Sequence, residues 1–344
     1  MRSPARSAIA SAFVLALAHA PAARAQALPQ DQLIARLSAA LDSLARRGDF
    51  SGVVVLAREG APVFQHAYGE ADREQHRPNR IDTGFNIGSI DKVFTATAIR
   101  QLATAGKLDL DSTLAKYWPD YPNAEVARRV TIRQILQMRS GIGGNIFGAP
   151  PGGTRHDIHR LRDYLPLFVS EPLEFDPGTQ QRYSNAGFIV LGLLVERLSG
   201  EAYYDYVHRH IFETAGMARS GWWPPDSLPA NTAIGYTPAD AEGRLVPGAP
   251  LHANTDLLPG RGSSAGGGYA TAQDLLRFLG ALRAGNVPGG PPPGIGVAGG
   301  APGLNAVLEG ALPGGYDLVA LTNLDPPAAE RVGRLVRGWL GARD

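Results

Sequence analysis

The chain has 344 residues, contains no cysteine, and carries 33 basic against 32 acidic side chains. Without cysteine, disulfide bonds and thiol chemistry are excluded. Arg2, Arg6 and Arg24 lie in the first 25 residues, so the rest of the chain has 30 basic against 32 acidic side chains and a net charge of −2, with histidine counted as neutral. This balance gives no electrostatic basis for binding nucleic acid.

Residues 1–25 have the pattern of a secretory signal peptide. Two arginines precede an apolar run at residues 9–20, and the sequence Ala-Arg-Ala at residues 23–25 fits a cleavage site. The apolar run is too short to cross a bilayer, and no later stretch is predicted to span one. We therefore expect residues 26–344 to form a periplasmic or secreted protein with no membrane anchor after cleavage.

The first predicted elements of the mature chain are a helix and a hairpin. Residues 30–47 repeat apolar side chains at helical spacing and end at Gly48, which favours a helix stop. Two β-branched and aromatic runs follow at residues 52–58 and 62–68, and the Glu-Gly-Ala sequence between them indicates a turn.

The middle of the chain is predicted to be mostly helical. Residues 131–139 and 271–282 both open with a threonine that suits an N-cap, and the apolar run at residues 187–198 stops before a glycine. Residues 285–303 are rich in glycine and proline and are predicted to be a loop.

Strands return near the C-terminus, at residues 304–309 and 317–323, followed by a helix at residues 328–340. Strands at both ends with helices between them predict an α/β fold plus an all-α region. The antiparallel sheet would be built from both termini and flanked by helices, and a helical domain would be inserted within it.

Ser89 and Lys92 form the first candidate site, in the stretch FNIGSIDKVF. The chain has only three lysines, Lys92, Lys107 and Lys116, and a partly buried lysine can lose its proton whereas arginine cannot. Residues three apart on a helix face the same side, so a neutral Lys92 could activate the Ser89 hydroxyl. The alternative is that Ser89 only caps the helix.

Tyr183 and Asn185 form the second candidate site, just before the apolar run at residues 187–198. A phenol can relay protons, and an amide can hold both a lysine and a substrate carbonyl. The alternative is that Asn185 caps the following helix and that Tyr183 packs beside it.

Together these motifs resemble those of the serine β-lactamase and penicillin-binding-protein superfamily, in its branch of class C β-lactamases, D-alanyl-D-alanine carboxypeptidases and esterases. Residues 89–92 match S-x-x-K, residues 183–185 match Y-x-N, and the resemblance covers nearly all of residues 30–344. It implies a β-lactamase/transpeptidase-like fold with the active site between a sheet part and a helical part. In this chain the sheet part would be about residues 48–85 and 290–344, and the helical part about residues 100–285.

The resemblance also implies roles for these residues in acyl transfer through an acyl-serine. Ser89 would be the nucleophile, Lys92 its activating partner, and Tyr183 the general base that later returns a proton to the leaving group. Asn185 would position the substrate and Lys92. Which of Lys92 and Tyr183 takes the first proton stays open.

A third motif of the superfamily, Lys or His followed by any residue and Gly, is altered in this chain. The corresponding residues are Val297, Ala298 and Gly299, so the cationic or polar side chain is missing. Backbone groups of Gly299 and Gly300 would still bind substrate, since a side-chain change removes no amide donor. Arg261 could supply a substitute cation, but a surface or turn role is favoured for it.

The sequence therefore predicts an exported serine hydrolase that acts on small ester, amide or peptide substrates, with ester hydrolysis favoured over β-lactam hydrolysis. No cofactor is expected, and no metal, because the clustered histidines at residues 156, 159, 208 and 210 lack a convincing third zinc ligand. The alternative is a catalytically impaired member that binds cell-wall peptide or a protein partner on the same scaffold.

Overall fold

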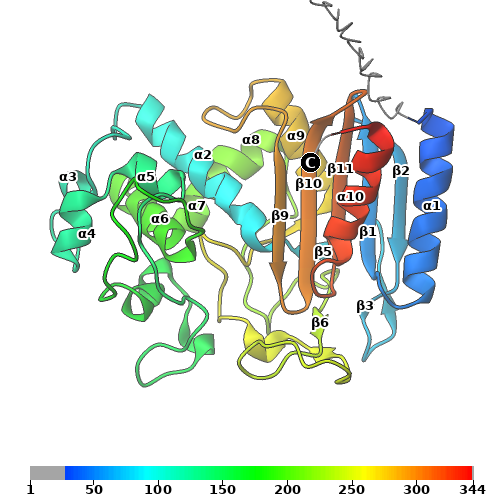
Figure 1. Ribbon diagram of the computed structural model, residues 1–344, viewed down its shortest axis with the longest axis horizontal. Coiled ribbons are helices and arrows are strands. Elements are labelled where there is room, and N and C mark those ends of the chain that lie inside the picture. The colour runs from blue at the N-terminus through cyan, green and yellow to red at the C-terminus, as the bar shows by residue number, and fades with distance from the viewer. Residues whose placement is uncertain (1–27, 343–344) are drawn as a thin grey trace, which may run out of the picture.

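The computed structural model describes residues 28–342, so the predicted signal peptide lies outside the described residues. Within them, a five-stranded antiparallel sheet has the order β2-β1-β11-β10-β9 (Figure 1). Strands from the two ends of the chain therefore form one sheet, which confirms the predicted fold class. The strands are β1 (Gly52–Arg58), β2 (Ala61–Tyr68), β9 (Gly296–Ala301), β10 (Leu304–Leu312) and β11 (Tyr316–Thr322).

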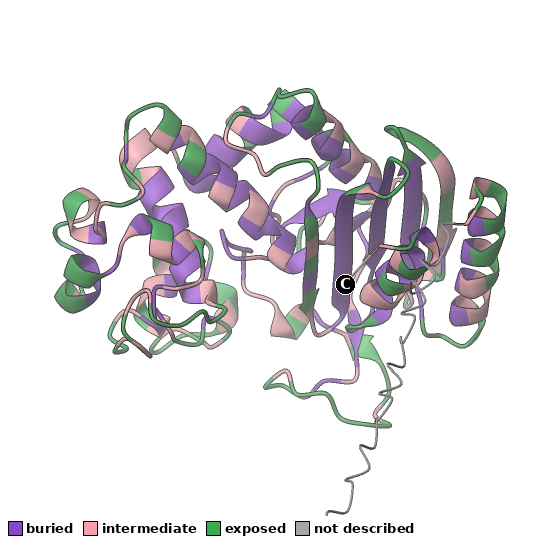
Figure 2. Cartoon of the chain, turned by 45° about the horizontal axis from the view of Figure 1, so that its top comes forward, coloured by how far each residue is buried: buried purple, intermediate pink, exposed green. Residues whose placement is uncertain are grey.

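Each face of this sheet is buried by a different set of helices. Val54 and Leu56 of β1 belong to a core with α1 (Gln30–Arg46) and α10 (Ala328–Leu340), whereas Val53 and Val55 belong to the larger core on the opposite face. This alternation follows from the two-residue period of a strand. Figure 2 shows the result, with buried central strands between helices that expose their outer sides.

The helical region packs against the second face and extends to the far end of the molecule from α1 (Figure 1). α2 and α6 contact each other, and α9 lies directly on β1 and β11. The helices of this region are α2 (Asp91–Thr104), α3 (Leu114–Tyr117), α4 (Ala124–Arg129), α5 (Ile132–Leu136), α6 (Asn185–Ser199), α7 (Tyr203–Val207), α8 (Glu213–Ala215) and α9 (Ala272–Arg283).

Several helix ends are set by the side chains that the sequence indicated. Thr131 and Gln134 form a capping box at the start of α5, and the Thr271 side chain accepts a hydrogen bond from the Asp274 N–H at the start of α9. α5 is shorter than the predicted helix at residues 131–139, since Met138 has a φ of 57°.

The prediction of a loop throughout residues 285–303 is wrong in its last part. Residues 296–301 form β9, the edge strand of the sheet, which pairs in register with β10. Glycine and alanine give this segment no alternating apolar pattern, so its extended state comes from pairing with β10 rather than from local preference.

Short strands outside the main sheet position the chain before α2. β5 (Gly84–Asn86) pairs with β8 (Tyr269–Thr271), and it leads directly into the turn that carries Ser89. The other short strands are β3 (Glu70–Asp72), β4 (Arg77–Pro78), β6 (Tyr236–Thr237) and β7 (His252–Ala253).

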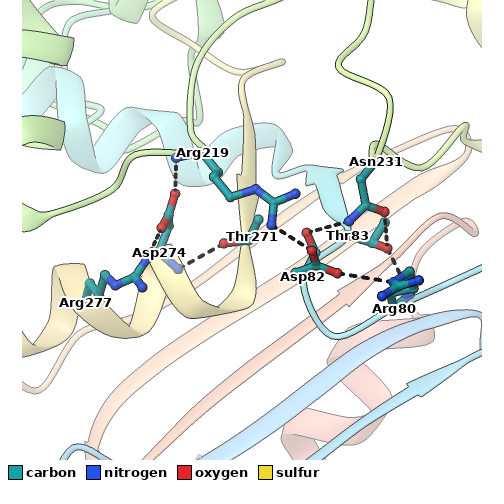
Figure 3. Close-up of polar contacts among 8 residues, drawn as sticks. All are labelled: Arg80, Asp82, Thr83, Arg219, Asn231, Thr271, Asp274 and Arg277. Atoms are coloured by element: carbon teal, nitrogen blue, oxygen red, sulfur yellow. Dashed lines mark hydrogen bonds and ion pairs between the residues drawn. The ribbon is translucent and has the colours of Figure 1, made fainter.

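A polar network fixes the entry to β5 (Figure 3). The buried carboxylate of Asp274 accepts hydrogen bonds from the Arg219 backbone N–H and from Arg277 Nη1, both at 2.7 Å. The Arg219 guanidinium pairs with Asp82 at 2.9 Å, and Asn231 donates to the Asp82 carbonyl at 3.1 Å. The network therefore ties α9 to the residues just before β5.

Among residues 28–342, no helix is long and apolar enough to cross a membrane.

Candidate active site

Ser89 lies in η1 (Gly88–Ile90), a single 3-10 turn between β5 and α2. Gly88 has a φ of 51°, and a Cβ there would come within 2.9 Å of Leu304 Cδ1 and 3.1 Å of the Gly300 nitrogen. The positive φ and the close approach both favour glycine at this position. The turn is thereby held against the hairpin of β9 and β10.

The Ser89 hydroxyl is shared by two other side chains. Lys92 Nζ lies 3.1 Å from Ser89 Oγ, and the Tyr183 hydroxyl donates to the same oxygen at 2.5 Å. α2 begins with no side-chain cap, so capping is not the role of Ser89. The Tyr183 side chain is 58% exposed although its hydroxyl reaches inward. Burial raises the pKa of this phenol above 10.

Lys92 is 7% exposed and is surrounded by hydrogen-bond acceptors. Its Nζ donates to Asn185 Oδ1 at 2.7 Å and to the carbonyl of Ala265. The amine also lies 4.7 Å from the centre of the Tyr183 ring. Burial lowers the pKa of Lys92 from 10.5 to about 7, and the charge of Asp91 opposes part of that lowering.

Asn185 is free to contact Lys92 because its neighbour caps the helix. The Ser184 hydroxyl accepts a hydrogen bond from the Gly187 N–H at 2.9 Å, which makes Ser184 the N-cap of α6. The alternative in which Asn185 is the cap is therefore wrong.

Asp91 is a buried charge beside Lys92 that the sequence did not single out. One of its carboxylate oxygens accepts hydrogen bonds from the Gly268 N–H at 2.5 Å and from the Trp222 indole at 3.2 Å, and the other has no hydrogen-bond partner among the described residues. Burial raises the pKa of Asp91 from 3.8 to about 7. These contacts hold the segment that carries the Ala265 carbonyl against α2.

β9 presents its backbone to the Ser89 turn. A Cβ on Gly299 would overlap the Ile87 carbonyl oxygen and would lie 2.9 Å from the Ser89 nitrogen. Ala301 and Leu304 flank a two-residue turn, so alternate residues of β9 bond to β10 and the Gly300 N–H points away from it. The Gly300 nitrogen and the Ser89 nitrogen therefore both lie where the Ser89 turn meets β9.

Val297 lies on the same face of β9 as Gly299, two residues away, opposite Leu308 of β10. Its side chain is partly buried against the larger core, and it does not line the cavity beside Ser89. Arg261 also lies outside that cavity, since its guanidinium carbon sits 3.6 Å from the centre of the Tyr204 ring.

The cavity beside Ser89 has a volume of about 370 Å³, within the usual range for small-molecule sites. Ser89, Asn185 and Gly300 belong to its lining, and we call this set the reaction wall. Residues from two surface segments, 145–158 and 242–259, also line the cavity, and we call this set the loop wall. The sequence did not indicate these segments as part of a site. Apolar residues of the lining are Ile146, Phe147, Ile158, Leu257, Leu258, Pro259, Ala265, Ala301, Pro302 and Leu304.

Trp222 is packed in an aromatic cluster and is 5% exposed, so it contacts Asp91 and does not line the cavity.

Within residues 28–342, no group of three or more acidic or histidine side chains is arranged to hold a metal ion. His210 instead contacts Glu201 at 3.0 Å.

Comparison with known proteins identifies the family. The Beta-lactamase family model matches residues 31–302, which is more than half of the chain. The chain belongs to the Beta-lactamase family. The putative penicillin-binding protein PbpX of Bacillus subtilis (strain 168) is 31% identical over 233 residues, covering 68% of this chain and 55% of PbpX. Esterase EstB of Burkholderia gladioli is 31% identical over 281 residues, covering 73% of this chain and 70% of EstB.

Solved structures show the same Beta-lactamase-family fold. A penicillin-binding protein from Bacillus halodurans superposes with a TM-score of 0.75 at 30% identity, covering 87% of this chain and 99% of that one. A D-amino acid amidase from Ochrobactrum anthropi SV3 superposes with a TM-score of 0.74 at 22% identity, covering 90% and 98% of the two chains. The chain spans only about half the length of PbpX, so similarity to PbpX does not extend to the whole of that protein.

Proposed function

We propose that this chain is an exported serine hydrolase that cleaves esters or amides through an acyl-serine intermediate on Ser89. The observation that carries the proposal is the contact of the Ser89 hydroxyl with both Lys92 and Tyr183, at the edge of a cavity. A capping serine needs neither partner. The esterase and amidase names among the similar proteins agree with this reaction class.

Lys92 is the group that takes the proton of Ser89 in this proposal. The Asn185 amide oxygen and the Ala265 carbonyl can only accept, so they hold the two hydrogens of a neutral amine. The lone pair of that amine is then left for the third neighbour, the Ser89 hydroxyl. With its pKa at about 7, a useful fraction of Lys92 is neutral at physiological pH.

Tyr183 acts as the acid toward the leaving group. Its raised pKa keeps the phenol protonated at neutral pH, which disfavours it as the first base. When Ser89 Oγ bonds to the substrate carbonyl carbon, its proton moves to Lys92. The bond to the leaving group then breaks as Tyr183 gives that group its proton, and the Lys92 ammonium restores the proton of the phenol. Water releases the acyl group by the reverse sequence.

The backbone amides of Ser89 and Gly300 stabilise the developing oxyanion. Both lie where the Ser89 turn meets β9, and neither depends on a side chain. Such preorganised donors typically contribute about 3–4 kcal/mol each to lowering the barrier. The missing cation at Val297 therefore leaves the acylation machinery complete, but it removes a partner for a carboxylate placed beside β9. We accordingly favour esters that place no carboxylate beside β9 over penicillins as substrates.

The deciding experiment uses residues 26–344 and the variant Ser89→Ala, with Ser227→Ala as the control because Ser227 is exposed and does not line the cavity. We expect the wild type and Ser227→Ala to hydrolyse short-chain nitrophenyl esters and to react with a fluorophosphonate probe. Ser89→Ala should do neither while keeping its melting temperature. The binding-scaffold alternative predicts no labelling of any of the three proteins, by the fluorophosphonate or by a fluorescent penicillin.

A further inference from the structure

Arg155 brings a positive charge to the same cavity as Ser89. Its guanidinium donates to the backbone carbonyls of Leu257 at 3.2 Å and Ala241 at 3.1 Å. It forms no ion pair with any carboxylate in residues 28–342. The side chain is therefore held in place by neutral acceptors, and its charge has no partner within the described part of the chain.

Among residues 28–342, Glu242 is the one carboxylate that lines this cavity, and it pairs with another side chain. Glu242 pairs with Arg244 at 2.8 Å, and Arg244 also bonds Asp240 at 2.8 Å. Asp157, two residues from Arg155, accepts hydrogen bonds from Thr154. Glu242 and Asp157 are thus engaged with other donors, and no carboxylate of the described residues forms an ion pair with Arg155, so its charge remains available to a ligand.

The cavity surface around these polar groups is mainly apolar, with Ile146, Ile158 and Leu304 buried in its lining. A partly enclosed guanidinium at such a surface suits a ligand with an apolar body and an anionic end. Arginine is the side chain best shaped for this, because its fork of N–H groups matches a carboxylate.

We propose that Arg155 determines specificity by binding a carboxylate at the end of an apolar arm of the substrate. This inference rests on the proposed hydrolase function, because the arm belongs to the ester or amide that Ser89 attacks. The carboxylate would be bound by the loop wall of the cavity. It would not lie beside β9, where Val297 provides no charge.

Paired substrates test this inference directly. The probes are 4-nitrophenyl monoesters of adipic and suberic acid and their neutral methyl esters. A second pair, the acetate ester of 4-(4-hydroxyphenyl)butanoic acid and its methyl ester, puts the carboxylate on the leaving group. For at least one pair, Arg155→Gln should lower kcat/KM of the anionic ester about 10- to 100-fold more than that of the neutral ester. Most of this loss in kcat/KM should come from a higher KM for the anionic ester, with little change in kcat.

Two further variants separate recognition from structure. Arg128→Gln removes an exposed arginine on α4 that does not line the cavity, and it should leave every ratio unchanged. Arg155→Lys keeps the charge without the planar fork and should restore part of the preference. If Arg155→Gln lowers the anionic and neutral rates equally in all pairs, Arg155 only supports the loops and the inference is wrong.

A binding measurement tests the role of Arg155 without requiring that the protein hydrolyse a substrate. Adipic acid monoanilide should bind to the Ser89→Ala variant at least about tenfold more tightly than to the double variant that combines Ser89→Ala with Arg155→Gln. Equal affinities would overturn the role of Arg155 even if the wild type hydrolyses esters. Absence of hydrolysis and of fluorophosphonate labelling, with Arg155-dependent binding retained, would instead refute the proposed function alone.

Discussion

The two walls of the cavity are built in different ways. On the reaction wall, Ser89 lies in the turn before α2 and Asn185 at the start of α6, and both form hydrogen bonds with the buried Lys92. On the loop wall, residues 145–158 and 242–259 contribute mostly apolar surface, and Arg155 is held by backbone carbonyls. In the proposed function, the reacting groups thus lie at the starts of helices, whereas substrate selection depends on surface segments whose sequence can change without disturbing the fold.

The difference predicts how each wall responds to mutation. On the reaction wall, a small change in one donor or acceptor should affect the rate for every substrate, because the groups act on the reacting atoms. On the loop wall, a change should alter the preference between substrates and leave the chemical step intact. The following variants test or sharpen this division, beginning with the largest expected effect.

Lys92→Arg should be nearly as damaging as Lys92→Ala, and both should lower kcat roughly 10²–10⁴-fold for every ester. Arginine keeps the positive charge but cannot become a neutral base, and its planar fork does not match the acceptors around Nζ. Steady-state kinetics at pH 8 provides the measurement. Lys107→Arg, at an exposed position, is the control. Full activity in Lys92→Arg would mean that Lys92 acts only as a charge.

Tyr183→Phe should slow alkyl esters about 10²-fold and nitrophenyl esters far less. An alkoxide needs a proton as it leaves, whereas a nitrophenolate leaves readily without one. Removal of the Tyr183 hydroxyl should therefore slow mainly the hydrolysis of alkyl esters. The ratio of the two kcat/KM values is the measurement, and Tyr117→Phe on α3 is the control. Equal losses for both esters would assign Tyr183 to positioning Ser89 rather than to proton transfer.

The elements that the sequence predicted well are those with a strong local pattern. α10 and β1 have the bounds expected from periodicity, and the threonine caps of α5 and α9 follow from short-range side-chain chemistry. β9 was missed because Gly-Val-Ala-Gly-Gly-Ala carries no alternation, and its extended state depends on β10.

The site shows the same limit. The motifs at residues 89–92 and 183–185 indicated four side chains that the structure brings together. Three other contacts could not be anticipated, because the residues that form them are distant in sequence. Asp91 contacts Trp222 and Gly268, and Lys92 contacts the Ala265 carbonyl, across 131 to 177 residues. Nothing local in the sequence specifies such pairings.

Val297→Lys should increase the preference of the enzyme for substrates that carry a carboxylate near β9. Val297 does not line the cavity, but it shares a face of β9 with Gly299, which lies against the Ser89 turn. We therefore expect the longer side chain of lysine to bring its amine near the bound substrate. We expect acylation by a carboxylate-bearing penicillin to rise about tenfold relative to hydrolysis of a neutral ester, or about 1.4 kcal/mol. The ratio of the two second-order rate constants measures this. An unchanged ratio in a folded variant would show that residue 297 does not reach the bound substrate.

Asp91→Asn should have the smallest effect, a shift of the pH profile rather than a loss of rate. Burial lowers the pKa of Lys92 to about 7, and the negative charge of Asp91 opposes this lowering. Lys92 must be neutral to accept the Ser89 proton, so activity rises as the pH increases through that pKa. Asparagine keeps an acceptor for the Gly268 N–H but removes the charge, so the pKa of Lys92 should fall further.

Because Asp91 itself has a pKa of about 7, its charge is present mainly at and above that pH. The acid limb of kcat/KM should therefore move to lower pH in Asp91→Asn, and activity at pH 7 should rise by up to about twofold relative to the plateau at pH 9. The measurement is the full profile from pH 5 to pH 9 with a neutral nitrophenyl ester. Asp111→Asn removes an exposed carboxylate that pairs with Arg133, and it should leave the profile in place. A shift to higher pH, or none, would mean that the limb reports a group other than Lys92. Tyr183 would then be the base that accepts the Ser89 proton. Because the pKa of this phenol is raised, activity should in that case continue to increase above pH 9.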